Sequence, residues 1–254
     1  MTPGWARAAR LAARTATLLT LAVAASGCPS VARPNPADPL EGWNRGVQRF
    51  NDSVDEAFVQ PVARSYRDLV PQPVRTGVTN FFGNLGDLWS TLNHVLQGNP
   101  EPALNMTLRV AVNTTFGLAG VLDIATEAGL DRHSEDFGQT LGRWGLPPGP
   151  YLVLPLAGPS SVRDTLGLPL DMAASAATLQ GVGVAEGDRW AATALQVINL
   201  RANLLGATRL LEDVALDRYS FLRDAYLARR RNLVYDGEPP EPPEPRYDLE
   251  EAPK

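Results

Sequence analysis

The stretch HSEDFGQTLGRWG, residues 133–145, places a histidine, a serine and an aspartate within four positions. These residue types form the catalytic group of many hydrolases, in which serine attacks, histidine takes its proton and aspartate orients the histidine. A lipid hydrolase would use His133 as base, Ser134 as nucleophile and Asp136 as the orienting carboxylate. Such close neighbours in sequence seldom meet in that geometry, and the sequence contains no G-x-S-x-G turn. We therefore favour a structural interpretation in which Ser134 caps a turn, and we predict that the protein is not an enzyme.

The only cysteine, Cys28, is the second residue with distinctive chemistry. A lone cysteine forms no intramolecular disulfide and no cysteine-based metal site. The two histidines add little to a transition-metal site, so we expect no cofactor and no metal.

Residues 1–27 explain the position of Cys28. They begin with Arg7, Arg10 and Arg14, continue with an apolar run over 15–25, and end in small residues directly before Cys28. This is the pattern of a signal peptide, and it resembles the lipobox of bacterial lipoproteins. Cleavage before Cys28 would leave that residue lipid-modified at the new N-terminus. The alternative is an ordinary secretory signal with an incidental cysteine. Pro29 is not the aspartate associated with inner-membrane retention, which favours the outer membrane.

The charge of the mature chain limits its partners. Without the three arginines of residues 1–27, the 23 basic residues fall to 20 against 28 acidic ones, a net charge of −8. This disfavours nucleic acid and gives no polybasic attraction to anionic lipid. No run of 18 apolar residues is present to form a transmembrane helix. Acyl chains and apolar faces would therefore have to hold the protein at a membrane.

The periodicity of apolar residues predicts helices. Spacings of three and four recur over 73–98, 102–117, 191–215 and 217–234. Pro73 suits a first helical turn and Gly98 a helix end, and Asp38 is predicted to cap a further helix. The single β-like run, 151–156, is interrupted by Pro155. We predict an all-α protein, and the 22 glycines and 22 prolines favour short helices arranged around something over long parallel ones.

The mature chain divides into three parts. Residues 28–37 form a short, proline-containing tether to the lipid. Residues 38–236 form a single domain. Residues 237–254 are rich in proline and glutamate and are predicted to be disordered.

Two further segments have residues suited to lipid. In the loop after Pro147, an apolar patch would be an aggregation hazard in water but useful against lipid or in a channel; a buried connection is the alternative. The patch consists of Tyr151, Leu152, Val153, Leu154, Pro155 and Leu156, and the first four of these are the candidates for lipid contact. Arg163 would pair with Asp164 or meet a phosphate headgroup. The ARRRN cluster at 228–232 would complement a helix end, bind phosphate, or dock an acidic partner.

Three stretches of this sequence resemble a known family. They are DPLEGWNRGVQRFNDSVDEAFVQPVARSYRDLVPQPVRTGVTNFFGNL from Asp38, HSEDFGQTLGRWGLPPGPYLVLPLAGPSSVRD over 133–164, and DRYSFLRDAYLARRR from Asp217. Together with the lipobox, they resemble the MlaA (VacJ) family of outer-membrane lipoproteins over nearly all of the mature domain. The resemblance implies a ring of short amphipathic helices embedded in the inner leaflet, with a central channel and an association with trimeric porins. Phe50 and Asn51 fall in the family's FN signature, which implies a role in domain conformation; ordinary packing of Phe50 is the alternative.

The resemblance also implies a function. Phospholipids mislocalised in the outer leaflet would leave it through the channel and pass to a soluble periplasmic carrier, so that lipid asymmetry is maintained. The sequence contains no G-x-x-x-x-G-K-[ST] phosphate loop, which agrees with passive transfer. Two alternatives stay open: a scaffold lipoprotein that binds porin without handling lipid, and the lipid hydrolase discussed above.

Overall fold

The computed structural model describes residues 38–214 and 216–240, and the side chains of 209–214 are not described. The predicted cleavage site at Cys28, the tether and residues 241–254 lie outside this part. The prediction of an all-α fold is confirmed, with one small hairpin among the helices. The elements are α2 (Glu41–Val54), a π-helical turn η1 (Asp55–Val59), α3 (Gln60–Leu69), α4 (Gln72–Gln97), α5 (Pro100–Thr115), α6 (Ile124–Glu127), α7 (Phe137–Arg143), β1 (Tyr151–Leu154), β2 (Gly158–Ser161), α8 (Val162–Gly181), η2 (Glu186–Asp188), α9 (Arg189–Val214) and α10 (Arg218–Val234).

Local signals place the helix ends largely as expected. Pro73 lies in the first turn of α4, and Gly98 ends it in the left-handed conformation with φ of 75°. The expectation for Asp38 is wrong, because α2 begins after Leu40 and has no side-chain cap. Asp38 is instead fully buried, where it accepts hydrogen bonds from Asn44 and Tyr219. A tertiary role has replaced the local capping role that its position suggested.

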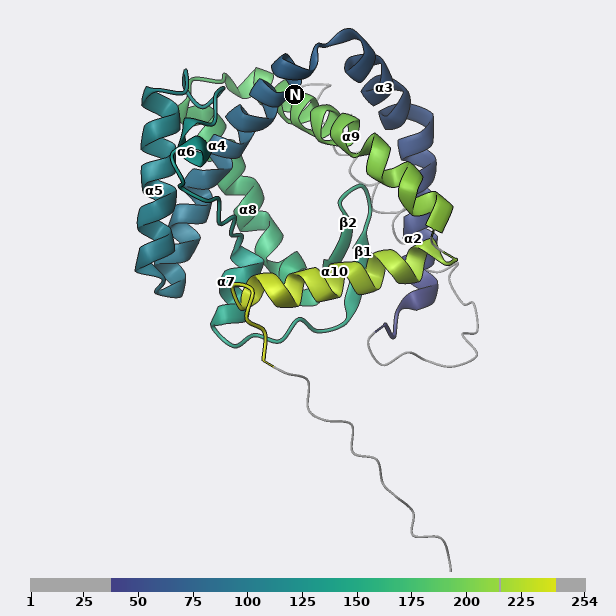
Figure 1. The fold of residues 1–254 in the computed structure, drawn as a ribbon. Helices are drawn as coiled ribbons and strands as arrows, with labels where there is room; N and C mark the ends of the chain where they lie inside the picture. Colours follow the sequence, from purple (N-terminus) through teal and green to yellow (C-terminus); the bar gives the residue numbers. More distant parts are fainter. Residues whose placement is uncertain (1–37, 215, 241–254) are drawn as a thin grey trace, which may run out of the picture.

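The elements follow one another around a ring (Figure 1). Starting at α2, each element packs on the next in the order β1, β2, α10, α7, α8, α4, α9, α3 and, through η1, α2 again. α5 and α6 lie outside this circuit, with α5 packed along α4. The β1–β2 hairpin stands on the inner side of the ring (Figure 1). No helix among the described residues is both long and apolar enough to cross a bilayer.

Two asparagines of α2 hold the hairpin. The amide of Asn44 accepts from Val153 N at 2.8 Å and donates to Tyr151 O at 3.0 Å. Two turns later, Asn51 donates to Leu154 O at 2.9 Å and accepts from Leu156 N at 2.8 Å. The two side chains thus bind backbone groups along one edge of β1 and in the turn that follows it, groups that a two-stranded sheet leaves without a partner strand.

The α4–α5 pair is inverted relative to a soluble protein, in that it buries mainly polar side chains and exposes large apolar ones. The residues that α4 and α5 bury are largely polar: Asn84, Asp87, Ser90, Asn93, His94, Arg109 and Asn113. Its exposed residues include large aliphatic side chains: Val74, Leu88, Leu92, Val95, Leu104 and Leu108. A water-soluble helix pair would bury those aliphatic side chains. The amphipathic stripes predicted from the sequence are therefore present, but on these helices much of the apolar surface points outward.

Candidate functional site

The three residues of the supposed hydrolytic group do not assemble. Within the described residues, no hydrogen bond joins His133 to Ser134 or to Asp136, and His133 and Ser134 are both exposed. Asp136 caps α7, where its carboxylate accepts from Gln139 N at 2.9 Å. The cap predicted in this segment therefore exists, but Asp136 forms it and not Ser134. The other histidine, His94, is buried, with Nε2 2.9 Å from His133 O.

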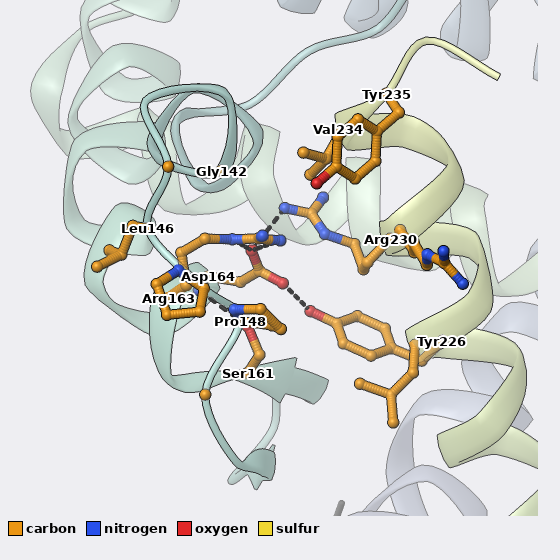
Figure 2. A pocket seen from close by; sticks show the side chains of 15 residues that line it. Gly142, Leu146, Pro148, Ser161, Arg163, Asp164, Tyr226, Arg230, Val234 and Tyr235 are labelled. Carbon is orange, nitrogen blue, oxygen red and sulfur yellow. Dashed lines mark hydrogen bonds and ion pairs between the residues drawn. The ribbon is translucent and has the colours of Figure 1, made fainter. Parts of the chain in front are cut away.

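A first hollow, the arginine hollow, lies between the 142–149 loop, the start of α8 and the end of α10 (Figure 2). Its volume is about 620 Å³, and Arg163 and Arg230 are both buried in its wall. Asp164 Oδ1 accepts from Arg163 Nη2 at 2.9 Å and from Arg230 Nη2 at 2.8 Å, and Oδ2 accepts from the Tyr226 hydroxyl. Arg230 Nη2 also donates to Asp136 Oδ1 at 2.9 Å. Arg230 therefore joins α10 to α7 through Asp136 and to α8 through Asp164.

Electrostatics in the arginine hollow favour the ionised forms. Burial acts to raise the pKa of Asp164, but the hydrogen bond and charge of Arg230 outweigh it, and that pKa lies below its usual value. Burial acts to lower the pKa of Arg230, but Asp136 and Asp164 reverse this and raise it. Of the two roles that the sequence left open for Arg163, the structure contains the pairing with Asp164. Arg230, the middle arginine of the ARRRN cluster, joins helices and does not complement the end of its own helix.

A second hollow, the polar hollow, lies between α4, α8, the start of α9 and residues 132–135, and its volume is about 620 Å³. Its lining combines apolar side chains with charged ones. The apolar ones include Phe82, Leu85, Leu168, Met172 and Leu179, and the charged ones are Asp87, Arg132, Glu135, Asp171 and Arg189.

Two guanidinium nitrogens at this hollow are buried and have no hydrogen-bond partner, Arg132 Nη2 and Arg189 Nε. Burial raises the pKa of Asp171 and also that of Asp87, where Arg132 and Arg109 oppose the shift. Apolar walls with unmet donors suit an amphipathic anionic or zwitterionic ligand. No group of three or more His, Cys, Asp or Glu residues in the described ranges could hold a metal ion.

A third hollow, the apolar hollow, adjoins the polar hollow at Phe82, which lines both. It has a volume of about 570 Å³, and no charged residue lines it. Its walls come from the first half of α4, from Val121 and from α9, namely Pro73, Val74, Gly77, Val78, Phe81, Phe82, Ala192 and Leu195. Such a surface matches an acyl chain.

Comparison with known proteins now decides the family. A family model described as MlaA lipoprotein matches residues 36–233. The chain belongs to the MlaA lipoprotein family.

Curated relatives of this MlaA family member match most of its length. Proteins named "Intermembrane phospholipid transport system lipoprotein MlaA" from Shigella flexneri and Escherichia coli K12 are each 37% identical over 226 residues, which cover 87% of this chain and 87% of theirs. The protein of that name from Haemophilus influenzae is 33% identical over 239 residues, covering 88% and 92%.

A solved structure agrees with the fold of this MlaA family member. It was reported as "Structural basis for maintenance of bacterial outer membrane lipid asymmetry" and matches with a TM-score of 0.66 at 35% identity, covering 78% of this chain and 98% of that one. The helical ring is thus shared with a related protein.

The residues predicted for lipid contact in this MlaA family member lie in different environments. Tyr151 and Val153 are buried in a small core with Val47 and Tyr219, so their side chains do not form an exposed lipid-contact surface. The alternating pleat explains the difference, because successive side chains of β1 point to opposite faces. Leu152 and Leu154 are half-buried.

Phe50, Asn51 and Arg163 were also named from the sequence of this MlaA family member. Phe50 is half-exposed on α2 at 51%, and Asn51 clamps the turn of the hairpin. Arg163 lines the arginine hollow. The structure does not bring these three residues to one site.

Sequence reasoning missed the charged residues of the polar hollow in this MlaA family member. Arg132, Asp171 and Arg189 come from a loop and two helices far apart in the chain, and no local motif joins them. One signal was available within α4, where Asp87 and Ser90 interrupt the apolar pattern at helical spacing.

Proposed function

We propose that this MlaA family protein is an outer-membrane lipoprotein on the periplasmic side that removes phospholipids mislocalised in the outer leaflet. In this proposal Cys28 carries the acyl anchor, and the lipid passes to a soluble periplasmic carrier, so that outer-membrane lipid asymmetry is maintained. The relatives' printed name, intermembrane phospholipid transport system lipoprotein, supports the class of cargo. The observation that carries the proposal is the inverted α4–α5 pair.

The inverted pair is understandable if its outer surface meets hydrocarbon. Leu88, Leu92 and Val95 on α4 continue onto Leu104 and Leu108 on α5, and all are exposed. Exposed apolar area of this kind in water is unfavourable by about 25 cal/mol per Å² and invites aggregation. In contact with acyl chains the same area has no such penalty. The helices would then lie within one leaflet, since no described helix is suited to span the bilayer.

The ring then gives a polar headgroup a path through that leaflet. Moving a charged group through hydrocarbon costs several kcal/mol or more. The polar hollow offers buried guanidinium groups and carboxylates beside apolar walls, so a headgroup and its acyl chains can both be accommodated. Transfer would be passive, and a downstream carrier that binds lipid would give it direction. No residue of the chain performs a covalent step in this scheme.

Partners follow from the same geometry. The exposed apolar surface of α4 and α5 faces lipid or a membrane protein partner, and we propose a trimeric porin as that partner. A scaffold that binds porin without handling lipid would need the outer surface but not the charged lining of the polar hollow. The lining therefore favours the conduit over the scaffold.

The test uses cells that lack the chromosomal copy and express variants of the full chain. Outer-leaflet phospholipid is measured by its accessibility to an added phospholipase. The wild-type chain should restore a low level, and Cys28→Ala should not, because the mature chain would lose its acyl anchor. His133→Ala should behave as wild type, because His133 does not line the polar hollow, whereas a hydrolase that used His133 as its base would lose activity. If the wild-type chain leaves outer-leaflet phospholipid unchanged, the proposed function is wrong.

A further inference from the structure

The lining of α4 changes character along the helix. From Pro73 to Phe82 its residues line the apolar hollow, and from Phe82 to Ser90 they line the polar hollow. On α9 the two linings interleave, with Ala192 and Leu195 on the apolar hollow and residues 189, 193 and 196 on the polar hollow. The two hollows are therefore adjacent on the same two helices and meet at Phe82. This is the arrangement that one amphipathic molecule requires.

Both arginines of the polar hollow have a guanidinium nitrogen without a hydrogen-bond partner among the described residues. Arg132 Nε lies 3.1 Å from Asp87 Oδ1, but its Nη2 is buried without a partner. Arg189 has a buried Nε without a partner and no ion pair with any described residue. Buried guanidinium donors are normally satisfied, and a phosphate is a ligand whose oxygens could accept from both.

Among the described residues, some acids of the polar hollow form ion pairs with cations of the protein and others do not. Asp87 is matched by Arg132 and by Arg109, whose Nε is 3.6 Å away. Asp171 Oδ1 accepts from Trp89 Nε1 at 2.7 Å and from Phe137 N at 2.9 Å, while Oδ2 has no partner among the described residues. Asp171 has no ion pair within the described part of the chain. Among the described residues of this lining, Arg189 is thus the cation without an ion pair, and Asp171 is an acid without one.

This balance points to a ligand that carries both signs of charge. A headgroup with a phosphate alone would bring its negative charge near Asp171, which is unfavourable at a partly desolvated site. A headgroup with a phosphate and a primary ammonium would match both free side chains. Glu135, the remaining acid of the lining, also has no ion pair among the described residues; it accepts from Gln97 Nε2 at 2.7 Å and is buried, whereas Asp171 is half-buried and therefore more accessible to a ligand.

We propose that the two hollows together bind one phospholipid with a zwitterionic, ethanolamine-type headgroup. Its phosphate lies at Arg132 and Arg189, its ammonium at Asp171, and one acyl chain passes Phe82 into the apolar hollow. The inference rests on the proposed function for the class of cargo, and it adds a preferred headgroup and an orientation along α4.

The first experiment measures headgroup preference. The purified full-length protein in detergent is equilibrated with equal amounts of phosphatidylethanolamine and phosphatidylglycerol, and the bound lipids are quantified by native mass spectrometry. The wild type should favour phosphatidylethanolamine. Asp171→Asn keeps an acceptor for Trp89 and Phe137 but removes the charge, so the preference should fall about fivefold, the effect of one partly exposed ion pair. The matched control is Asp188→Asn, an exposed acid next to Arg189 that lines neither hollow, and it should leave the ratio unchanged.

A second variant separates the two ends of the headgroup. Arg189→Gln should lower the binding of both lipids by a similar factor, because both carry the phosphate. Arg64→Gln on α3, an exposed arginine outside the hollows, should have no effect. Equal capture of the two lipids by the wild type, or an unchanged ratio in Asp171→Asn with native helicity, would overturn the headgroup assignment.

The second experiment tests the orientation. A photocrosslinking amino acid is placed on α9 at Leu195, which lines the apolar hollow, or at Val197, which is similarly exposed but does not line it. A lipid radiolabelled in its acyl chain should crosslink more strongly at 195 than at 197. Equal crosslinking would overturn the orientation while leaving the conduit intact. Absence of any bound or crosslinked lipid would instead contradict the proposed function itself.

Discussion

Asn44 is the residue on which the hairpin most depends, because its one amide both donates to and accepts from the backbone of β1. It accepts from Val153 N and donates to Tyr151 O and to Asp38 Oδ1, and it is fully buried. Asn44→Ala should lower the free energy of unfolding by about 2–3 kcal/mol, because a buried N–H and C=O lose their partners. Chemical denaturation in detergent measures this. Ser53→Ala, on the exposed side of α2, should cost less than about 0.5 kcal/mol. Similar costs for the two variants would mean that Asn44 does not hold β1.

Glu135 should make stability depend on pH. Burial raises the pKa of Glu135 to about 7, against which the hydrogen bond from Gln97 is not sufficient. The folded protein therefore binds a proton that the unfolded chain has already released between pH 4.5 and about 7. Stability from this group is present below pH 4.5 and is lost as pH rises through 7, by up to about 3 kcal/mol.

Glu135→Gln isolates that dependence. The variant keeps a polar side chain but has no charge to bury, so it should be more stable than wild type at pH 8 and differ less at pH 5. Denaturation at both pH values gives the comparison. The control is Glu101→Gln, an exposed acid on α5, which should follow the wild type. A Glu135→Gln variant whose stability falls with pH as steeply as that of the wild type would contradict this assignment.

Among the elements, α7 and α8 pack so closely that a single methyl group should separate them. A Cβ on Gly167 of α8 would lie 2.7 Å from the backbone nitrogen of Gly138 in α7. Gly167→Ala should therefore destabilise the fold by about 1–3 kcal/mol, despite the higher helix propensity of alanine. Gly206→Ala in α9 meets nothing within 4 Å and should instead stabilise by about 0.5–1 kcal/mol. Thermal unfolding of both variants tests the contrast, and a stabilising Gly167→Ala would disprove the close packing.

The helices could be predicted from the sequence where their signals are local. α4 and α10 begin and end within one residue of the ranges expected from apolar spacing, and Pro73 and Gly98 mark the ends of α4. The direction in which α4 turns its apolar stripe could not be predicted, because a stripe shows that two faces differ and not which medium each one meets. The hairpin depends on Asn44, which is 107 residues away from Tyr151, and no local pattern contains that pairing.

The candidate site follows the same division. Arg163 and Asp164 are neighbours in the sequence, and their ion pair was predictable for that reason. Arg132, Asp171 and Arg189 become one lining only after α4, α8 and α9 have packed. Their function is a property of the ring and not of any motif.

On the scale of the whole molecule, the ring closes through polar contacts between the two ends of the described chain. Asp38 accepts from Tyr219, and Arg223 Nη1 lies 3.5 Å from it. Arg45 of α2 donates to Asp217 Oδ2 at 2.6 Å. Since much of the apolar surface faces outward, buried polar groups and not a large hydrophobic core must fix how α10 sits against its neighbours.

Arg230 tests this view, because it joins α10 to both α7 and α8 through Asp136 and Asp164. Arg230→Gln leaves two carboxylates without that cation, and the expected loss is about 3 kcal/mol, at the lower end for a broken buried pair because Asp136 keeps some solvent contact. Hydrogen exchange should rise in α10 and remain low in α4, since α10 is released from the ring while the α4–α5 pair stays packed. Arg229→Gln, its exposed neighbour on α10, should change stability by less than about 0.5 kcal/mol. If exchange in α4 rose as much as in α10, the ring would be unfolding as one unit, and closure at Arg230 would not be the separate step that the contacts indicate.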